Sequence, residues 1–309
     1  MSDKINIFLA SDDNYAKWLG VVVISLIQSS GHPLDIYIAS HHISDKNKQK
    51  LKSLETAHAK INLFEIDEKI FDKCYHTKRF PIASLIRMVI ASTLPNLDKI
   101  IWLDSDILVR GDLWNLFNTP MDGYLLAACK DIGCDYCLKL IGFDDGVYVN
   151  SGVLVMNLDL IRKQNIENKL LNVMSNQQLP FPDQDAINIV CHNQISELPA
   201  KYNSMREKCR NSDDVILHYV LGKPWKTFNS AWEYEMFWKI FKNSPWKNEY
   251  FPIRLKFIIS QILSFIYRKD VSESKTKFIL FNLPILKISK KNNRTFYSFL
   301  GIPLLKKII

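Results

Sequence analysis

The feature that most constrains this chain is a regular alternation of short apolar runs and longer amphipathic segments over its first hundred residues. The runs predict strands at 6–10, 34–39, 60–66 and 99–103, and the segments between them predict helices at 18–29, 44–56 and 82–94. This alternation is typical of a parallel sheet covered by helices on both faces. Apolar runs at 124–129 and 152–157 predict strands in the middle of that sheet, and helices are expected at 159–175 and 183–191. We therefore expect an α/β fold with a mostly parallel sheet.

Basic charge is concentrated in the last part of the chain. The 309 residues carry a net charge of +8, and the stretch from Ser244 to Ile309 holds thirteen Lys or Arg against three Asp or Glu, whereas the remainder holds 27 against 29. A nucleic-acid enzyme usually carries basic charge around its active cleft, so this distribution argues against a nucleic-acid partner. A cationic appendage on a near-neutral body fits an anionic surface better. We divide the chain into a body at 1–244 and a C-terminal segment at 245–309.

The C-terminal segment combines basic and aromatic residues. We expect an amphipathic helix at 253–267, followed by two similar stretches, Leu283–Lys287 and Ile302–Lys306, each preceded by aromatic residues. Two copies are too few for a solenoid. Segments of this composition bind at the interface of bilayers, so we predict a helical, amphipathic segment that attaches the protein to an anionic membrane surface. The alternative is a subdomain that packs on the body or forms a dimer contact.

The chain shows no export signal and no apolar stretch long enough to span a bilayer. Its first 25 residues lack a basic start followed by a long apolar run, and no run of 18 uncharged apolar residues occurs. Six cysteines in a chain of this length do not indicate a disulfide framework. Cys134 and Cys137 have the C-x-x-C spacing but no second pair for zinc, so ordinary thiols are expected. We expect a cytoplasmic protein bound peripherally to the inner face of the cell membrane.

Two carboxylates directly follow the strand predicted at 99–103. Alternate residues of an extended chain point the same way, so Asp104 and Asp106 should converge beyond a strand end, where open sheets bind ligands. His218 closes another apolar run and could complete a metal site, which favours Mn²⁺ over Mg²⁺ because Mn²⁺ accepts nitrogen more readily. In the alternative interpretation Asp104 caps the next segment, Asp106 is merely solvated and His218 is structural.

Two residues shortly after His218 suit a phosphate. Lys223 could place a compact positive charge on a departing phosphate, and Gly222 lets the backbone approach it closely.

Together these residues resemble those of family 8 glycosyltransferases, the retaining sugar transferases that include bacterial lipopolysaccharide galactosyl- and glucosyltransferases and glycogenin. The similar stretches occur in family order from residue 5 to about 225, and their joint occurrence is specific. They are Ala10–Tyr15, Arg87, Leu103–Asp106 with Val109–Arg110, Asn150–Leu154, Pro182–Asp185, His218–Tyr219 and Lys223–Trp225.

The resemblance implies a GT-A fold, a nucleoside-diphosphate sugar donor, usually UDP-linked, and Mn²⁺, with Mg²⁺ as the alternative ion. Asp104, Asp106 and His218 would hold the metal on the diphosphate. The remaining donor-binding residues that the resemblance implies are Ala10, Asp12, Asn14, Arg87, Ser105, Asp131, Asn150, Asp183, Gly222 and Lys223.

Gln184 stands where the family places a residue beneath the reacting carbon. A retaining displacement through a covalent intermediate needs a carboxylate nucleophile. A carboxamide is a poor nucleophile, so Gln184 would instead stabilise an oxocarbenium-like state, unless Asp183 or Asp185 points inward and acts as nucleophile. Lys223 would assist the leaving diphosphate. The spacing from His218 to Lys223 is one residue shorter than in the family, with Leu221 before Gly222, so this loop should turn differently.

The sequence thus predicts transfer of a hexose, galactose or glucose, from a UDP-sugar to a glycan or glycolipid such as lipopolysaccharide core. The sequence also allows two alternative functions, a metal-dependent phosphoesterase and a non-catalytic, membrane-bound sugar-nucleotide-binding protein. A phosphoesterase does not need the pairs Asp12/Asn14 and Asp183/Gln184, and a scaffold does not need an intact metal triad.

Overall fold

The structure is a computed structural model of the whole chain. It describes residues 3–75, 81–134, 136–205, 210–220, 222–226, 231–272, 275–280, 283–291, 294–300 and 302–308. The chain divides into two compact units, of which the first comprises Met1–Pro224 and Asn229–Lys247 and the second Trp225–Phe228 and Asn248–Ile309.

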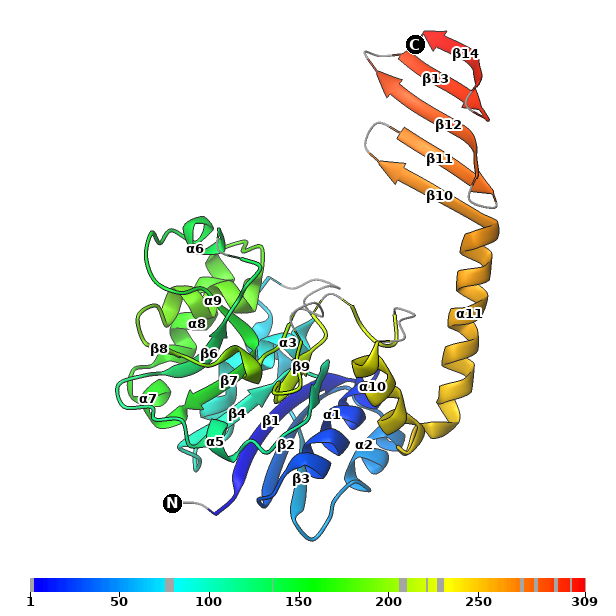
Figure 1. The fold of residues 1–309 in the computed structure, drawn as a ribbon. Coiled ribbons are helices and arrows are strands. Elements are labelled where there is room, and N and C mark those ends of the chain that lie inside the picture. Colours follow the sequence, from blue (N-terminus) through cyan, green and yellow to red (C-terminus); the bar gives the residue numbers. More distant parts are fainter. Residues whose placement is uncertain are drawn as a thin grey trace. The chain divides into compact units, whose positions relative to one another are not determined.

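A seven-stranded sheet in the order β3-β2-β1-β4-β7-β6-β8 forms the centre of the first unit (Figure 1). Its strands are β1 (Ile5–Asp12), β2 (Leu34–His41), β3 (Ala59–Glu65), β4 (Lys99–Leu103), β6 (Leu126–Lys130), β7 (Val149–Asn157) and β8 (Ile195–Glu197). Only the two pairings of β7 are antiparallel, and the other four are parallel. The prediction of a mostly parallel sheet is confirmed, and every predicted strand forms within a few residues of its expected bounds.

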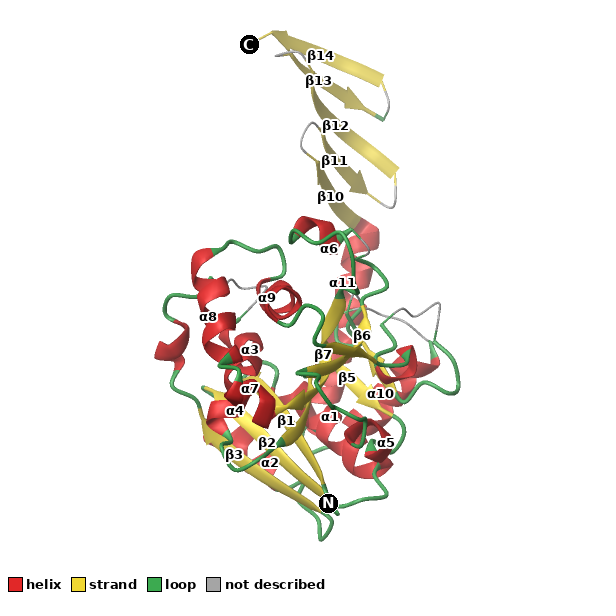
Figure 2. Cartoon of the chain, turned by 90° about the vertical axis from the view of Figure 1, so that its left-hand side faces the viewer, coloured by secondary structure: helices red, strands yellow, loops and turns green. Residues whose placement is uncertain are grey.

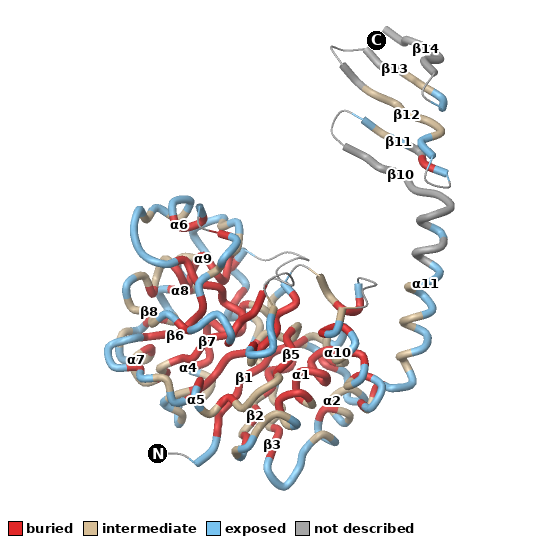
Figure 3. Tube along the Cα trace, in the orientation of Figure 1, coloured by how far each residue is buried: buried red, intermediate tan, exposed pale blue. Residues whose placement is uncertain are grey.

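Helices cover both faces of this sheet. Figure 2 shows α3, α8 and α9 on one side of it and α1, α5 and α10 on the other. The helices of the first unit are α1 (Ala16–Ser29), α2 (Asp45–Lys52), α3 (Ile82–Leu85), α4 (Ile90–Thr93), α5 (Trp114–Phe117), α6 (Cys137–Leu140), α7 (Leu158–Lys163), α8 (Ile166–Asn176), α9 (Pro182–Val190) and α10 (Trp232–Lys242). Short 3₁₀ turns are η1 (Glu68–Phe71), η2 (Ile86–Val89) and η3 (Ala200–Tyr202), and η5 (Lys247–Glu249) spans the junction of the two units. Strands β1 and β7 are buried along nearly their whole length, as a doubly covered sheet requires (Figure 3).

Two predicted helices are interrupted. The helix expected at 82–94 consists of α3, η2 and α4, and the one expected at 159–175 divides into α7 and α8. Asn165 separates the latter pair with a φ of 52°, a left-handed conformation that Asn adopts more readily than most residues. At the start of α2 the Ser44 side chain caps the helix, because it accepts a hydrogen bond from the Asn47 backbone amide.

A second, two-stranded sheet was not predicted from the sequence. It pairs β5 (Ile107–Val109) antiparallel with β9 (Ile216–His218), so that Ile107 lies opposite His218. Each strand is only three residues long, which is too short for a periodic signal. This pairing brings the residue after Asp106 beside the predicted histidine.

Aromatic residues of α10 belong to the core of the first unit. Trp18 of α1 contacts Phe237, Trp238 and Phe241. Trp246 is fully buried, donates to Asn47 and lies against Gly20, where any Cβ would enter its ring. Packing therefore accounts for these tryptophans.

The C-terminal unit contains α11 (Tyr250–Ile266), which matches the predicted helix at 253–267. The expectation of further helical segments is wrong, because the chain continues as a five-stranded antiparallel sheet in sequential order. Its strands are β10 (Tyr267–Ser272), β11 (Lys275–Leu280), β12 (Leu283–Lys291), β13 (Arg294–Phe299) and β14 (Ile302–Ile308). Many β-branched and aromatic residues favour strands here.

The predicted internal similarity corresponds to two equivalent hairpins in this sheet. Both similar stretches begin a strand, β12 or β14, and in each the register shifts just after a proline, Pro284 or Pro303. Proline lacks the amide that a ladder needs, so it is tolerated at such irregular positions.

The register gives this sheet two different faces. Residues opposite each other across a strand pair share a face. One face includes Leu286, Ile288, Tyr297 and Phe299, and the other includes Lys277, Lys287 and Ser298.

Two further results concern the cysteines and membrane spans. Cys134 and Cys137 form a disulfide, contrary to the expectation of ordinary thiols, whereas Cys74, Cys129 and Cys191 are buried and not part of a disulfide. Among the helices that the structure describes, none combines the length and apolar character needed to cross a membrane.

Candidate active site

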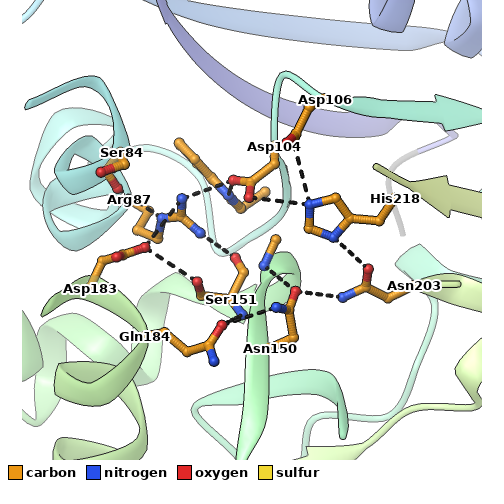
Figure 4. A network of polar contacts seen from close by, with 12 residues as sticks. Ser84, Arg87, Asp104, Asp106, Asn150, Ser151, Asp183, Gln184, Asn203 and His218 are labelled. Carbon is orange, nitrogen blue, oxygen red and sulfur yellow. Dashed lines mark hydrogen bonds and ion pairs between the residues drawn. The ribbon is translucent and has the colours of Figure 1, made fainter. Parts of the chain in front are cut away.

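The three predicted metal ligands converge in the structure. Asp104 and Asp106 lie in the turn between β4 and β5, and His218 ends β9. The Nε2 atom of His218 is 3.7 Å from Oδ2 of Asp104 and 3.2 Å from Oδ1 of Asp106. The backbone confirms this arrangement, since the amide of Tyr219 donates to the carbonyl of Asp106 over 3.0 Å. The predicted convergence is thus confirmed, and the three side chains can be seen in Figure 4.

A chain of hydrogen bonds fixes which nitrogen of His218 carries the proton. The Gly152 backbone amide donates to Oδ1 of Asn150 over 3.0 Å, and the Asn203 amide donates to the same oxygen over 2.8 Å. Oδ1 of Asn203 is therefore an acceptor, and the Nδ1 of His218 that lies 2.8 Å from it must be the donor. In a neutral imidazole the lone pair is then on Nε2, which faces the two carboxylates.

The imidazole of His218 is held neutral by its surroundings. Burial lowers its pKa to about 4, although the nearby Asp104 carboxylate acts in the opposite direction. At neutral pH the Nε2 lone pair and two carboxylate oxygens therefore meet with no proton between them. Such a set of three acceptors is stable when it shares a cation, and it suits a divalent metal ion.

Gly152 leaves room for these ligands. A Cβ at this position would lie inside contact distance of the His218 ring, 2.9 Å from its Nδ1, and 3.0 Å from Oδ2 of Asp104. Any side chain here would separate the histidine from the carboxylate. The predicted motif Asn150–Leu154 is thus needed partly for the space that its glycine leaves.

Lys223 reaches the same cluster, since its ammonium pairs with Oδ2 of Asp106. The adjacent Gly222 is anchored through its carbonyl, which accepts from the hydroxyl of Tyr234 over 3.0 Å. Leu221, on which the predicted difference in loop length depends, lies outside the described residues. Lys223 therefore lies directly beside the predicted metal ligands.

Arg87 connects the metal ligands to the next group of polar residues. Its buried guanidinium contacts Oδ1 of Asp104 at 2.8 Å and Oδ2 of Asp183 at 3.4 Å, and it also donates to the Ser151 carbonyl. Trp102 donates to the same oxygen of Asp104 over 3.0 Å and lies under the guanidinium. These contacts fix the orientation of the Asp104 carboxylate.

Four residues predicted to contact the donor sugar or its reacting carbon form one network. Gln184 accepts from Asn150 over 3.0 Å and from the Ser151 amide over 3.2 Å, and its own amide donates to Asp131 over 3.0 Å. Asp183 accepts from the Ser151 hydroxyl over 3.3 Å. Asp183 and Gln184 lie in the first turn of α9. Together with Arg87 they join the metal ligands to Gln184 through a continuous series of contacts (Figure 4). Gln184 in turn contacts Asp131.

Asp185, the alternative nucleophile, is engaged elsewhere. One of its oxygens accepts from the hydroxyl of Tyr148, and the other accepts from the Phe181 backbone amide over 2.8 Å. Burial raises the pKa of this carboxyl group. The structure therefore gives Asp185 a structural role in capping α9.

The expected nucleoside-binding residues lie at the end of β1. Ala10 is buried, Asp12 accepts from the Tyr15 amide over 2.9 Å, and Asn14 is exposed in the following turn. Because β1 and β4 are neighbours and parallel, their carboxyl ends lie at the same edge of the sheet. The predicted nucleoside and metal residues thus share one edge.

Comparison with known proteins identifies the family. A sequence model described as glycosyl transferase family 8 matches residues 6–229. The chain belongs to this family. A lipopolysaccharide 1,2-glucosyltransferase of Escherichia coli K12 is 25% identical over 273 residues, which are 80% of each chain. General stress protein A of Bacillus subtilis is 28% identical over 210 residues, 65% of this chain and 73% of that one. A protein of Haemophilus influenzae is 29% identical over 210 residues, and the match spans 64% of its length.

Solved structures show the same fold. The galactosyltransferase LgtC, in complex with donor and acceptor sugar analogues, superimposes with a TM-score of 0.67 at 22% identity, covering 78% of this chain and 96% of that one. The bifunctional glycosyltransferase WbbM gives 0.69 at 23% identity, covering 82% and 52%. Identities this low show the fold alone, which is the predicted GT-A fold. The chain is thus a family 8 glycosyltransferase with a residue set that can hold a divalent metal.

Sequence reasoning missed several residues that support this site. Asn203 sets the tautomer of His218, and Trp102 and Ser151 orient Asp104, Arg87 and the sugar network. Ser151 lies inside the predicted motif Asn150–Leu154 and Trp102 directly precedes Leu103–Asp106, so both could have been assigned roles there. Asn203 follows η3 with no motif of its own, so only the folded chain places it beside His218.

Proposed function

We propose that this chain transfers a hexose, galactose or glucose, from a UDP-sugar to a glycan of the lipopolysaccharide type, with Mn²⁺ as its metal ion. The observation that carries the proposal is the cluster of Asp104, Asp106 and His218, whose imidazole lone pair faces both carboxylates. Two oxygens and one nitrogen suit Mn²⁺.

The chain's own residues supply most of the chemistry. A bound metal ion would neutralise charge on the diphosphate as the sugar leaves. Lys223, already beside Asp106, adds a positive charge on that leaving group. Asp12 and Asn14 bind the nucleoside, and Asp131 and Asn150 accept and donate hydrogen bonds that orient the hexose. Arg87 holds Asp104 and Asp183 in place and contacts the donor from there.

The way in which Gln184 is held supports a retaining transfer. Asn150 and the Ser151 amide both donate to the side-chain oxygen of Gln184, so its orientation is fixed. A fixed carboxamide oxygen stabilises positive charge on a sugar carbon without forming a stable bond to it. As the bond to the diphosphate breaks, the acceptor hydroxyl attacks from the same face and gives its proton to the departing diphosphate oxygen. Asp183, paired with Arg87 and Ser151, hydrogen-bonds sugar hydroxyls and helps to hold the donor for this step.

The acceptor is inferred from the relatives and from the C-terminal unit. The Escherichia coli relative is named a lipopolysaccharide 1,2-glucosyltransferase. In the C-terminal unit, α11 exposes a row of apolar side chains that includes Phe251, Ile258 and Leu263, and β12 and β13 expose Leu283 and Phe299. These side chains, with the basic charge of the segment, bind an anionic membrane at its cytoplasmic face, where a lipid-linked acceptor is held.

A screen of UDP-sugars tests the transfer. With Mn²⁺ present, the chain should hydrolyse one UDP-hexose slowly without acceptor and transfer it faster when a glycolipid is added. The Asp106→Ala variant should do neither. Release of phosphate from simple monoesters would instead support a phosphoesterase, and UDP-sugar binding without turnover under all acceptors would support a binding protein.

A flotation experiment tests the membrane role. The double variant Phe251→Asp and Ile258→Asp should lose its binding to vesicles that contain phosphatidylglycerol. Leu140→Asp is the matched control, since Leu140 is a similarly exposed leucine, at 64%, in the first unit. Equal flotation of the double variant and the control would contradict membrane attachment through α11.

A further inference from the structure

A second group of metal-ligating side chains lies at the same edge of the main sheet. His41 is the last residue of β2, His42 follows it, and Glu68 is the first residue of η1. Within the part of the chain that the structure describes, only this group and the Asp104 cluster bring three such side chains together. The register pairs His41 with Asp12, so the group lies beside the expected nucleoside-binding residues.

The geometry of this group fits a small ion. Nε2 of His41 is 2.9 Å from Oε2 of Glu68, and Nε2 of His42 is 3.3 Å from the same oxygen. In a tetrahedral zinc site with bonds of about 2.0–2.1 Å, neighbouring ligand atoms are about 3.3 Å apart. Both distances to the carboxylate are therefore close to this spacing, and all three ligand atoms lie within 4.8 Å of one another.

The local chain supports this spacing. His42 has a φ of 60°, so the backbone turns between the two histidines and lets successive side chains face one point. The two rings lie with their centroids 4.6 Å apart. Partial exposure of all three side chains gives an ion access from solvent.

The chemistry of this set differs from that of the first cluster. Two nitrogens and one oxygen, with a fourth position open to water, are typical ligands of Zn²⁺. One nitrogen and two carboxylates, as in the Asp104 cluster, are closer to the preference of Mn²⁺. The two groups are therefore expected to select different ions.

We propose that His41, His42 and Glu68 form a second metal site, which binds Zn²⁺ or a similar borderline transition metal. The ion ties η1 to the end of β2. Because β2 pairs with β1 along its whole length, this tie holds the segment after β3 next to the Asp12 turn. The site is distinct from the transfer chemistry and does not depend on it.

A zinc titration with a competing chelator tests this site. The Asp106→Ala chain is used so that the first cluster does not bind, and it should bind one equivalent of Zn²⁺. Adding His42→Asn or Glu68→Gln should weaken this binding by at least about tenfold, that is by about 1.4 kcal/mol or more. Asn tolerates the left-handed backbone of His42, so the fold should be preserved. His58→Asn, at another exposed histidine, is the control and should change nothing.

Two further readouts report on geometry. Co²⁺ added to the Asp106→Ala chain should give the visible absorption of a four-coordinate ion, and Glu68→Gln should abolish it. Zn²⁺ should slow amide hydrogen exchange in residues 66–75 of the Asp106→Ala chain and not of its His42→Asn derivative. Zinc binding that is unaffected by both substitutions, or no zinc binding by the Asp106→Ala chain, would overturn the proposal.

Discussion

The two side-chain clusters at the edge of the main sheet have similar ligands but very different surroundings. His218 is buried, and its tautomer is fixed by Asn203, Asn150 and the Gly152 amide. The side chains of His41 and His42 are 22% and 73% exposed, and both pair with Glu68. A buried cluster with a prearranged lone pair suits catalysis, because it needs little reorganisation when its ion binds. An exposed cluster can bind an ion but is held less firmly.

The largest expected difference between the clusters is in transfer itself. Asp106→Asn removes one charge from the first cluster and should lower the transfer rate by about a thousandfold or more, because a metal ion contributes several kcal/mol to charge stabilisation. Glu68→Gln is the matching change in the second cluster. Glu68→Gln should not change the Mn²⁺ concentration that gives half the maximal transfer rate. A large change in this concentration would contradict the different roles of the two clusters. Steady-state kinetics across Mn²⁺ concentrations measure both.

Gly152→Ala should give the next largest effect. The new methyl group would enter the space between His218 and Asp104, so Mn²⁺ affinity should fall by about a hundredfold, which is about 2.7 kcal/mol. Gly111→Ala is the control, since the heavy atoms nearest to a Cβ there all belong to Val215 and not to the metal cluster. Unchanged Mn²⁺ affinity in Gly152→Ala would show that the ion is held elsewhere.

Asn203→Leu tests the prearranged tautomer. Loss of the acceptor for Nδ1 lets His218 place its proton on Nε2, so Mn²⁺ affinity should fall by about ten- to a hundredfold. Unlike a general loss of structure, this effect should spare UDP binding measured without metal. Equal losses of UDP and Mn²⁺ binding would indicate that Asn203 only supports the fold.

A pH dependence of stability should distinguish the buried histidine. The pKa of His218 is about 4 in the folded chain against an ordinary value of 6.5, so the unfolded chain binds the extra proton first as the pH falls. Proton binding by the unfolded chain therefore lowers the free energy of unfolding as the pH falls from 6.5 to 4, by on the order of 3 kcal/mol in total. Urea unfolding of the parent and His218→Asn at pH 7.5 and 4.5 measures the difference, which should shrink at the lower pH. A constant difference would contradict a buried, neutral His218.

The sequence predicted the parts of the fold that have a strong local pattern. Strand β4 and the Asp104–Asp106 turn were predicted because an apolar run ends at two alternating carboxylates. It did not predict β5 or its pairing with β9, since three-residue strands have no period. It also missed Asn203, whose role exists only after β9 pairs with β5. For the strands after α11 the sequence predicts amphipathic helical segments instead, because a mixture of basic and apolar residues fits both a helix and a strand until the register is known.

The most direct test of the central claim is the electron spin-echo spectrum of Mn²⁺ bound to the full chain in the presence of UDP. If Asp104, Asp106 and His218 share this ion, the spectrum should show coupling to one imidazole nitrogen, and His218→Asn should remove it. Mn²⁺ that supports transfer without any nitrogen coupling would contradict the account.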